Sequence, residues 1–207
     1  MKENIILIGG GGHCKSCIDV IDSEGRFSIA GIVDVKESMG KKVLGYEIIA
    51  SDEDLPRLTK DYRNYVITMG QIQSPAKRIR IFETLKGLNA NMPMIISPVA
   101  YLSKYARIDE GTMVMHHALI NADAHIGRNC IINTKAIVEH DAIIESNCHI
   151  STGAIINGGT IIRQNSFIGS NAMVREYVEV GRNSVVGAGF SVMKDLPENS
   201  ILKKGDP

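Results

Sequence analysis

The chain has 207 residues, 44% of them hydrophobic, and its 23 Lys plus Arg balance its 23 Asp plus Glu. This length allows two domains, and the balanced charge gives no overall field that would attract nucleic acid or an anionic membrane. No apolar run approaches the ~20 residues of a membrane span, and the apolar segment of MKENIILIGGGG is too short for a signal peptide. Four cysteines without a small-domain disulfide pattern indicate reduced thiols. We therefore expect a cytoplasmic protein without membrane insertion and without a nucleic acid partner.

Strands alternate with helices over residues 1–97, which we predict to be the first domain. Apolar segments at 4–9, 27–35 and 64–70 are typical of buried parallel strands. Segments 13–25, 52–61 and 74–89 have helical spacing or helix-start and helix-stop residues. This alternation predicts a small α/β domain with a parallel sheet.

From residue 106 the sequence repeats every six residues, from ARIDEG to FSVMKD, through fifteen hexads without an insertion. The third residue of every hexad, from Ile108 through Val192, is Ile or Val; the first is small in thirteen and the sixth is Gly, Asn or Asp in twelve. Neither a helix nor a hairpin strand has this period, whereas a β-helix of short parallel strands does. Three hexads make one coil, so the repeat predicts five coils. Such coils are usually left-handed, and we predict an all-β left-handed parallel β-helix over residues 98–207.

Residues eighteen apart should lie on successive coils, about 4.8 Å from each other. His140 occupies an outward corner between Glu139 and Asp141, and Gly158 follows at the same corner one coil later. Flanking carboxylates favour a general base at His140, and a bare glycine N–H suits the charge that develops on a carbonyl oxygen in acyl transfer. An Asp is also common at the sixth position of the hexad because it suits the turn. The repeat alone therefore does not decide whether His140 is catalytic.

The next corner column reads His116, Thr134, Thr152, Ser170, Ala188. After His116 every residue of this column has a small side chain. It therefore predicts a groove in which an extended ligand could lie.

A metal site is the alternative use of the histidines. Metal ligands must converge on one point, but His116 and His140 fall on different corners and His149 points out of a flat face. We therefore expect no metal, and we expect His116 and His125 to be surface residues.

The cysteines form two pairs in the sequence. CKSC, with Cys14 and Cys17 at a helix start, allows redox chemistry, although packing behind a phosphate loop is the favoured interpretation. Cys130 and Cys148 are eighteen apart at the small position, so we expect them to be free thiols stacked inside adjacent coils.

Five segments match one family: ILIGGGGHCK at 6–15, GIVD at 31–34, TMG at 68–70, NTKAIVEHD at 133–141 and CHISTGAIINGG at 148–159. With them the chain resembles the bacterial sugar acetyltransferases of the NeuD/PglD type over essentially its whole length. The resemblance implies a Rossmann-like N-terminal domain that binds a nucleotide-sugar and a left-handed β-helix that binds acetyl-CoA. It also implies a homotrimer with acetyl-CoA between adjacent prisms.

The resemblance assigns roles to solenoid residues. The general base falls on His140, and the acidic residue that raises its basicity falls on Asp141. His149 matches the histidine near the thioester, Gly158 the backbone N–H that meets its carbonyl, and Asn133 the Asn that opens the same motif. Positions that line the pantetheine arm fall on Ser170 and Ala188, in agreement with the small-residue column.

In the N-terminal domain the resemblance implies nucleotide-sugar binding by a glycine loop and by an Asp after the second strand. These residues are Gly10, Gly11, Gly12, His13, Asp34 and Gly70. Glycines let backbone N–H groups approach phosphate at a helix N-terminus. NAD binding is less well supported, because after Gly9 and Gly11 the last glycine of G-x-G-x-x-G is replaced by Cys14.

The sequence therefore predicts an acetyl-CoA-dependent acetyltransferase that acts on the amino group of a nucleotide-linked amino sugar for surface glycan synthesis. O-acetylation of a sialic acid or a related nonulosonic acid is the alternative, because the same base and oxyanion donor serve both. A non-catalytic nucleotide-sugar-binding module is the second alternative.

Two segments depart from the family pattern. ILKKGDP at 201–207 replaces a GVPAK-like ending, so we expect a tail that helps to close over the coenzyme to be absent or shortened. The loop VKESMGKKVLG at 35–45 has basic residues that could meet phosphate but do not identify a sugar.

Overall fold

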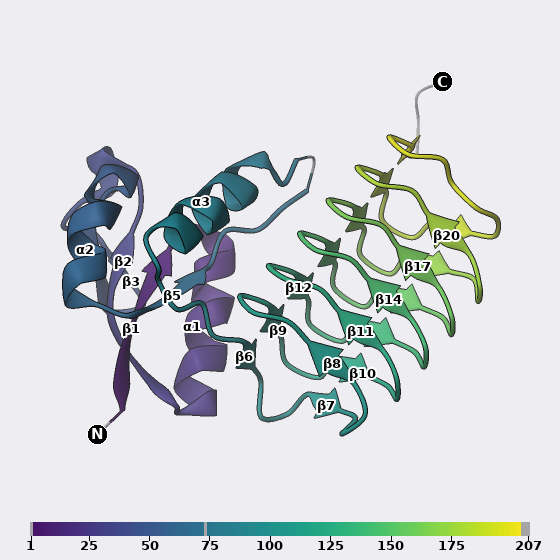
Figure 1. The fold of residues 1–207 in the computed structure, drawn as a ribbon, viewed down its shortest axis with the longest axis horizontal. Helices are drawn as coiled ribbons and strands as arrows, with labels where there is room; N and C mark the ends of the chain where they lie inside the picture. The colour runs from purple at the N-terminus through teal and green to yellow at the C-terminus, as the bar shows by residue number, and fades with distance from the viewer. Residues whose placement is uncertain (1, 73, 204–207) are drawn as a thin grey trace.

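The computed structural model describes residues 2–72 and 74–203. The first part of the chain forms a five-stranded sheet of order β3-β4-β2-β1-β5, parallel except where β3 runs antiparallel to β4 (Figure 1). The elements of this part are β1 (Glu3–Ile8), α1 (Gly12–Glu24), β2 (Phe27–Val33), β3 (Lys42–Val43), β4 (Tyr46–Ala50), α2 (Leu55–Asp61), β5 (Asn64–Ile67) and α3 (Ala76–Gly87), with 3-10 turns at η1 (Lys36–Ser38) and η2 (Asp52–Asp54).

Helices cover both faces of this sheet. Ile5 and Leu7 of β1 pack with α1 on one face, while Ile6 and Ile8 pack with α2 and α3 on the other. Burial on both faces explains the continuous apolar run, and the predicted α/β class is confirmed.

A hairpin was not predicted. Part of the segment expected to be a loop forms η1 and β3, and β4 follows it as a strand. Leu44 (φ 48°) and Gly45 (φ 91°) form the two-residue turn between β3 and β4, where both backbones are left-handed. Leu-Gly is a weak hairpin signal beside Asn-Gly, which is why the sequence did not reveal the turn.

The second part of the chain is a solenoid whose two-residue strands form three parallel sheets. Figure 1 shows its successive coils stacked along one axis. The first sheet has β6 (Ile95–Ile96), β9 (Met113–Val114), β12 (Ile131–Ile132), β15 (His149–Ile150), β18 (Phe167–Ile168), β21 (Val185–Val186) and β23 (Ile201–Leu202). The second has β7 (Tyr101–Leu102), β10 (Leu119–Ile120), β13 (Ile137–Val138), β16 (Ile155–Ile156), β19 (Met173–Val174) and β22 (Ser191–Val192). The third has β8 (Arg107–Ile108), β11 (His125–Ile126), β14 (Ile143–Ile144), β17 (Ile161–Ile162) and β20 (Glu179–Val180).

From β6 to β19 each strand pairs with the strand eighteen residues later; His149, for example, pairs with Ile131 and Phe167. At the end of the solenoid β21 pairs with β23, sixteen residues later. The third residue of the hexad fills the axis of the solenoid, so that Ile132 and Ile150 have no exposed surface. Cys148, at the small first position, is buried beside them. These features confirm the left-handed β-helix predicted from the repeat.

A ladder of asparagine side chains follows one corner of the solenoid. Each Nδ2 donates to the Oδ1 of the next residue over 2.8–3.2 Å, in the order Asn129, Asn147, Asn165, Asn183, Asn199. At its start Arg78 of α3 donates from Nη2 to Oδ1 (3.0 Å) and to the backbone oxygen (2.7 Å) of Asn129. The positive charge of Arg78 therefore lies at the end of aligned amide dipoles.

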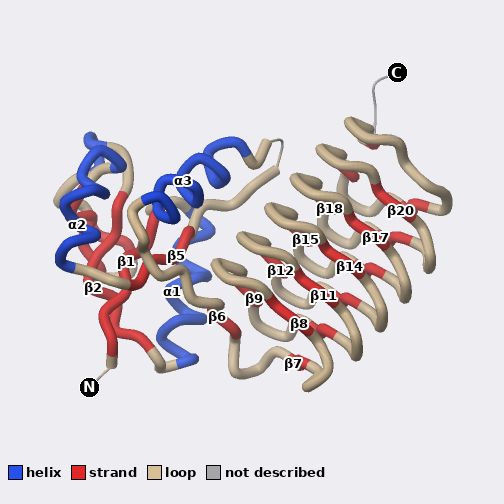
Figure 2. Tube along the Cα trace, viewed as in Figure 1, coloured by secondary structure: helices blue, strands red, loops and turns tan. Residues whose placement is uncertain are grey.

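The core of the α/β part continues into the solenoid. Ile95, Met113 and Met115 pack in the same cluster as Cys17 and Ile18 of α1, and Figure 2 shows α1 beside the first coils. In the part of the chain that the structure describes, no helix has the length and apolar character needed to cross a membrane. The altered C-terminal ending lies partly outside the described residues, at 204–207.

Candidate active site

His140 and Gly158 lie together at the corner between the second and third sheets, as the eighteen-residue count predicts. Gly159 N–H donates to His140 O (3.0 Å), which joins the two coils. A Cβ on Gly158 would lie 2.6 Å from Cε1 and 2.7 Å from Nε2 of His140, so the imidazole packs against the bare Cα.

Asp141 orients the imidazole of His140. Their Nδ1 and Oδ2 atoms are 2.7 Å apart, and since a carboxylate only accepts, Nδ1 carries the proton. This leaves Nε2 on the glycine side free to take a proton. The hydrogen bond that His140 donates to Asp141, followed by the charges of Asp141 and Glu139, raises the pKa of His140 above its usual value.

The amide of Gly158 is a ready hydrogen-bond donor. Within residues 2–72 and 74–203 its N–H has no acceptor, whereas its carbonyl accepts from Tyr177 N–H (3.0 Å). A base beside an unpaired N–H is the arrangement that acyl transfer requires.

His149 points out of its flat face, as expected, but the N-terminal domain covers it and leaves it only 5% exposed. Its Nδ1 donates to Gln71 O (2.6 Å), and its Nε2 accepts from Asn133 Nδ2 (3.1 Å). Burial lowers the pKa of His149 to about 3, so the ring is neutral. The contact with Gln71 was not visible in the sequence.

His13 of the glycine loop lies across the junction, with its ring centroid 6.3 Å from that of His149. Burial and the nearby Arg78 lower its pKa to about 4. Among the described residues, His13 Nε2 and Gln71 Oε1 are buried without a hydrogen-bond partner. A Cβ on Gly70 would lie 3.7 Å from the Cβ of His13, so two predicted substrate residues are neighbours.

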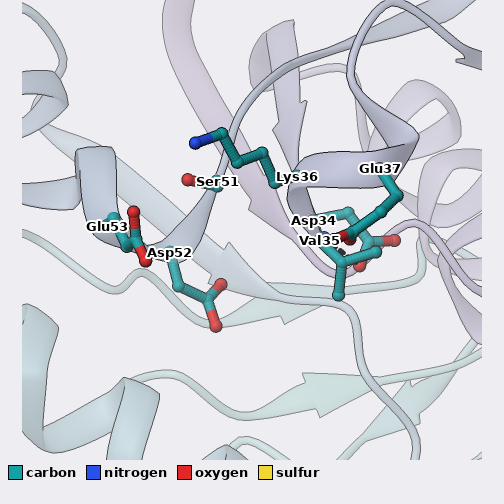
Figure 3. A pocket seen from close by; sticks show the side chains of 7 residues that line it. All are labelled: Asp34, Val35, Lys36, Glu37, Ser51, Asp52 and Glu53. Carbon is teal, nitrogen blue, oxygen red and sulfur yellow. Dashed lines mark hydrogen bonds between the residues drawn. The ribbon is translucent and has the colours of Figure 1, made fainter.

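The glycine loop and Asp34 meet at the carboxyl ends of β1 and β2. Gly10 N–H donates to Asp34 Oδ2 (2.8 Å) and Val35 N–H to Oδ1 (2.7 Å). Gly11 and Gly12 have open space where a Cβ would be, at the start of α1. Beside them a cavity of about 310 Å³ is lined by residues 34–37 and 51–53 (Figure 3). This edge has the shape and free amides to hold a phosphate-linked group.

Ser170 and Ala188 occupy the corner between the first and second sheets. Ser170 is half-buried with its Oγ 3.1 Å from Ser151 Oγ, and Ala188 is exposed. Asn133 begins the same corner two coils earlier. The small-residue column therefore runs along a corner different from that of His140.

His116 is held more firmly than a plain surface residue. Ser97 donates to its Nδ1 (2.7 Å), and its Nε2 donates to Asp19 Oδ2 (2.9 Å) on α1. Ser97 is 1% exposed, so the arrangement ties α1 to the solenoid rather than forming a nucleophilic site. His125 is exposed, 3.3 Å from Asp109, as expected of a surface residue.

All four cysteines are free and buried. Burial raises the pKa values of Cys14 and Cys17, so both remain protonated thiols, and packing rather than redox chemistry fits this pair. Within the described parts of the chain, no group of three His, Cys, Asp or Glu side chains converges as metal ligands would.

Comparison with known proteins agrees with this geometry. Residues 4–85 match the family model "PglD N-terminal domain", and residues 159–189 match "Bacterial transferase hexapeptide (six repeats)". No curated protein matches the chain in sequence.

Three solved structures are similar over nearly the whole chain. A His-to-Asn variant of perosamine N-acetyltransferase from Caulobacter crescentus, in complex with CoA and GDP-perosamine, is 31% identical with a TM-score of 0.90, over 96% of this chain and 92% of that one. The acetyltransferase domain of PglB from Neisseria gonorrhoeae, in complex with acetyl coenzyme A, is 28% identical with a TM-score of 0.88, over 97% and 96%. WeeI from Acinetobacter baumannii, 20% identical with a TM-score of 0.84 over 97% and 96%, shares the fold.

The fold, the hexapeptide-repeat match and the similar solved structures define an acyltransferase of the hexapeptide-repeat class. The chain belongs to the NeuD/PglD-type family of bacterial sugar acetyltransferases. It is therefore an enzyme, and the non-catalytic alternative is not retained.

Proposed function

We propose that the protein transfers the acetyl group of acetyl-CoA to the amino group of a nucleotide-linked amino sugar, in the synthesis of a surface glycan. The contact of His140 with bare Gly158 carries the proposal, because it sets a base and an oxyanion donor side by side. The relatives crystallised with CoA, acetyl coenzyme A or GDP-perosamine support this choice of substrates. O-acetylation of a sialic acid remains the alternative acceptor chemistry.

In the proposed reaction Nε2 of His140 takes a proton from the attacking amine while Asp141 holds Nδ1–H. The amine nitrogen bonds to the thioester carbon, and Gly158 N–H stabilises the negative charge on the carbonyl oxygen. The C–S bond then breaks, and the departing coenzyme thiolate takes the proton from His140.

The donor would lie along the corner of Ser170 and Ala188, with its thioester near Asn133 and His149. Small side chains leave room there for a pantetheine arm. Since His149 is neutral and held by Gln71, it offers a fixed dipole rather than a second base.

The acceptor's nucleotide would bind at the glycine loop, with Gly10 to Gly12, His13 and Gly70 around its phosphates, and with Asp34 and the adjoining cavity around the remainder. In this division residues 1–97 bind nucleotide-sugar and residues 98–207 bind acetyl-CoA. The free cysteines support a reducing, cytoplasmic location.

The proposed assembly is a homotrimer, and the positions of the two histidines support it. The N-terminal domain packs on the first sheet around His149, whereas His140 lies at the corner between the other two sheets, opposite that face. A sugar held by the domain would therefore meet His140 of a neighbouring copy. Face-to-face packing of the second sheet would bring the donor corner of one copy to the His140 corner of the next. Its outward aliphatic side chains are half-buried in one copy: Leu119, Ile137, Ile155 and Met173.

Thiol release from acetyl-CoA with nucleotide amino-sugars and sialic acids tests the activity. We expect release with an amino sugar, and a loss of roughly 10²–10⁴-fold in His140→Ala. Release at background with every acceptor would reject the activity, and full activity in His140→Ala would reject the base.

Mixed oligomers test the shared site. Asp34→Ala and His140→Ala should each be inactive alone, and co-expression should restore activity because some neighbours pair an intact domain with an intact base. Mixed oligomers without activity would contradict a site built from two copies.

A further inference from the structure

Tyr177 is an unusual residue at the corner that carries the proposed catalytic residues. Its side chain is 77% exposed, the largest fraction among the exposed large hydrophobic residues of the described chain. Its φ of 56° is left-handed, a conformation that glycine and asparagine adopt more readily. At the sixth position of the hexads, His117 and Lys135 are the other residues in this conformation that are not Gly, Asn or Asp.

The ring of Tyr177 lies on a bare glycine. A Cβ on Gly159 would collide with Cδ1 and Cε1 of Tyr177, so one edge of the ring packs against the bare Cα of Gly159 on the preceding coil. Tyr177 N–H also donates to Gly158 O. Within the described residues the Tyr177 hydroxyl has no hydrogen-bond partner in the chain, and the residue is exposed.

The order of the coils places the ring on one side of the proposed acetyl position. His140 precedes Gly158 along the solenoid axis, and Tyr177 follows it. In the proposed homotrimer the pantetheine arm lies along Ser170 and Ala188 of the neighbouring copy, and these residues also follow the level of Gly158 toward the C-terminal end. The acceptor would enter from the other end, where the N-terminal domain packs.

We propose that Tyr177 is a donor-site residue whose ring packs against the pantetheine arm next to the thioester. This inference rests on the proposed function. The aromatic face of Tyr177 could pack against the apolar part of pantetheine. The ring would then cover the thioester and keep water away from it. A strained backbone that persists at such a corner is consistent with a role in binding.

Calorimetric titration with coenzyme A tests the inference without knowledge of the acceptor. Tyr177→Gly removes the ring and relaxes the backbone, so the Kd for coenzyme A should rise about tenfold while the melting temperature stays equal or rises. Tyr177→Phe should bind within about twofold of wild type. His117→Gly is a matched control, since it relaxes the same backbone conformation three coils before Ser170, away from the proposed pantetheine positions, and its Kd should be unchanged.

Three results would overturn the inference: an unchanged Kd in Tyr177→Gly, a rise in the acceptor KM instead of the coenzyme Kd, or a change in oligomeric state. If wild type binds no coenzyme A, the proposed function falls together with this inference. If wild type binds it and Tyr177→Gly binds equally well, only the inference falls.

Discussion

The imidazole of His140 packs against the Cα of Gly158, one coil further along the same corner. Any side chain at residue 158 would occupy the space of the ring. Residue 158 must therefore be glycine to leave room for the His140 ring, and not because the turn needs a glycine there.

Gly158→Ala should fold normally but lose activity. Ala122 occupies the same corner two coils earlier, so the solenoid accepts a Cβ at this position. The new Cβ would push the His140 ring aside and crowd the oxyanion site, and we expect a loss of about 10²-fold in kcat. A steady-state assay with circular dichroism checks this; unchanged kcat in a folded variant would contradict it.

Asp141→Asn should change the pH profile. The Asp141 hydrogen bond raises the pKa of His140, so in wild type the base is protonated, and activity falls, as pH drops through this raised value. Without the carboxylate charge the acid limb should move to lower pH, with a lower plateau because the imidazolium is less stabilised. An unmoved limb in kcat/KM profiles would show that a different group titrates.

Acid should destabilise the junction of the two parts. The pKa of His149 is lowered to about 3, so the unfolded chain binds more protons as pH falls below about 6.5. The stabilising contribution is present above that pH and is lost toward pH 3. At pH 4.5 the loss is about 3 kcal/mol from His149 alone.

His149→Gln, which carries no charge at either pH, is the test of this effect. Its free energy of unfolding should fall less between pH 7 and pH 4.5 than that of wild type, as measured with urea. Equal falls in the two proteins would mean that His149 is accessible to protons in the folded state.

Arg78→Met should destabilise the fold. Arg78 is 2% exposed, and it donates to Met69 O and to both oxygens of Asn129. Loss of these donors leaves buried acceptors unpaired, at a cost of about 2–4 kcal/mol. Arg80→Met on the exposed side of the same helix should change stability by less than about 0.5 kcal/mol. Equal effects of the two substitutions in urea denaturation would contradict this role for Arg78.

The solenoid could be predicted because the same packing requirement recurs every six residues. Each Ile or Val at the third position must fill the axis, and counting by eighteen alone brings His140 to Gly158. The coverage of His149 by Gln71, and the buried Arg78, could not be predicted. They depend on how a separate sheet packs on the first coils, which no repeat encodes. The β3–β4 hairpin was missed because Leu44-Gly45 is a weak turn signal.

A crystal structure with acetyl-CoA bound tests the central proposal most directly. We expect the thioester carbonyl oxygen about 2.7–3.1 Å from Gly158 N, with His140 Nε2 of the same copy facing the carbonyl carbon and the pantetheine arm passing Ser170 and Ala188 of the neighbouring copy. A thioester held away from the His140 corner would contradict it.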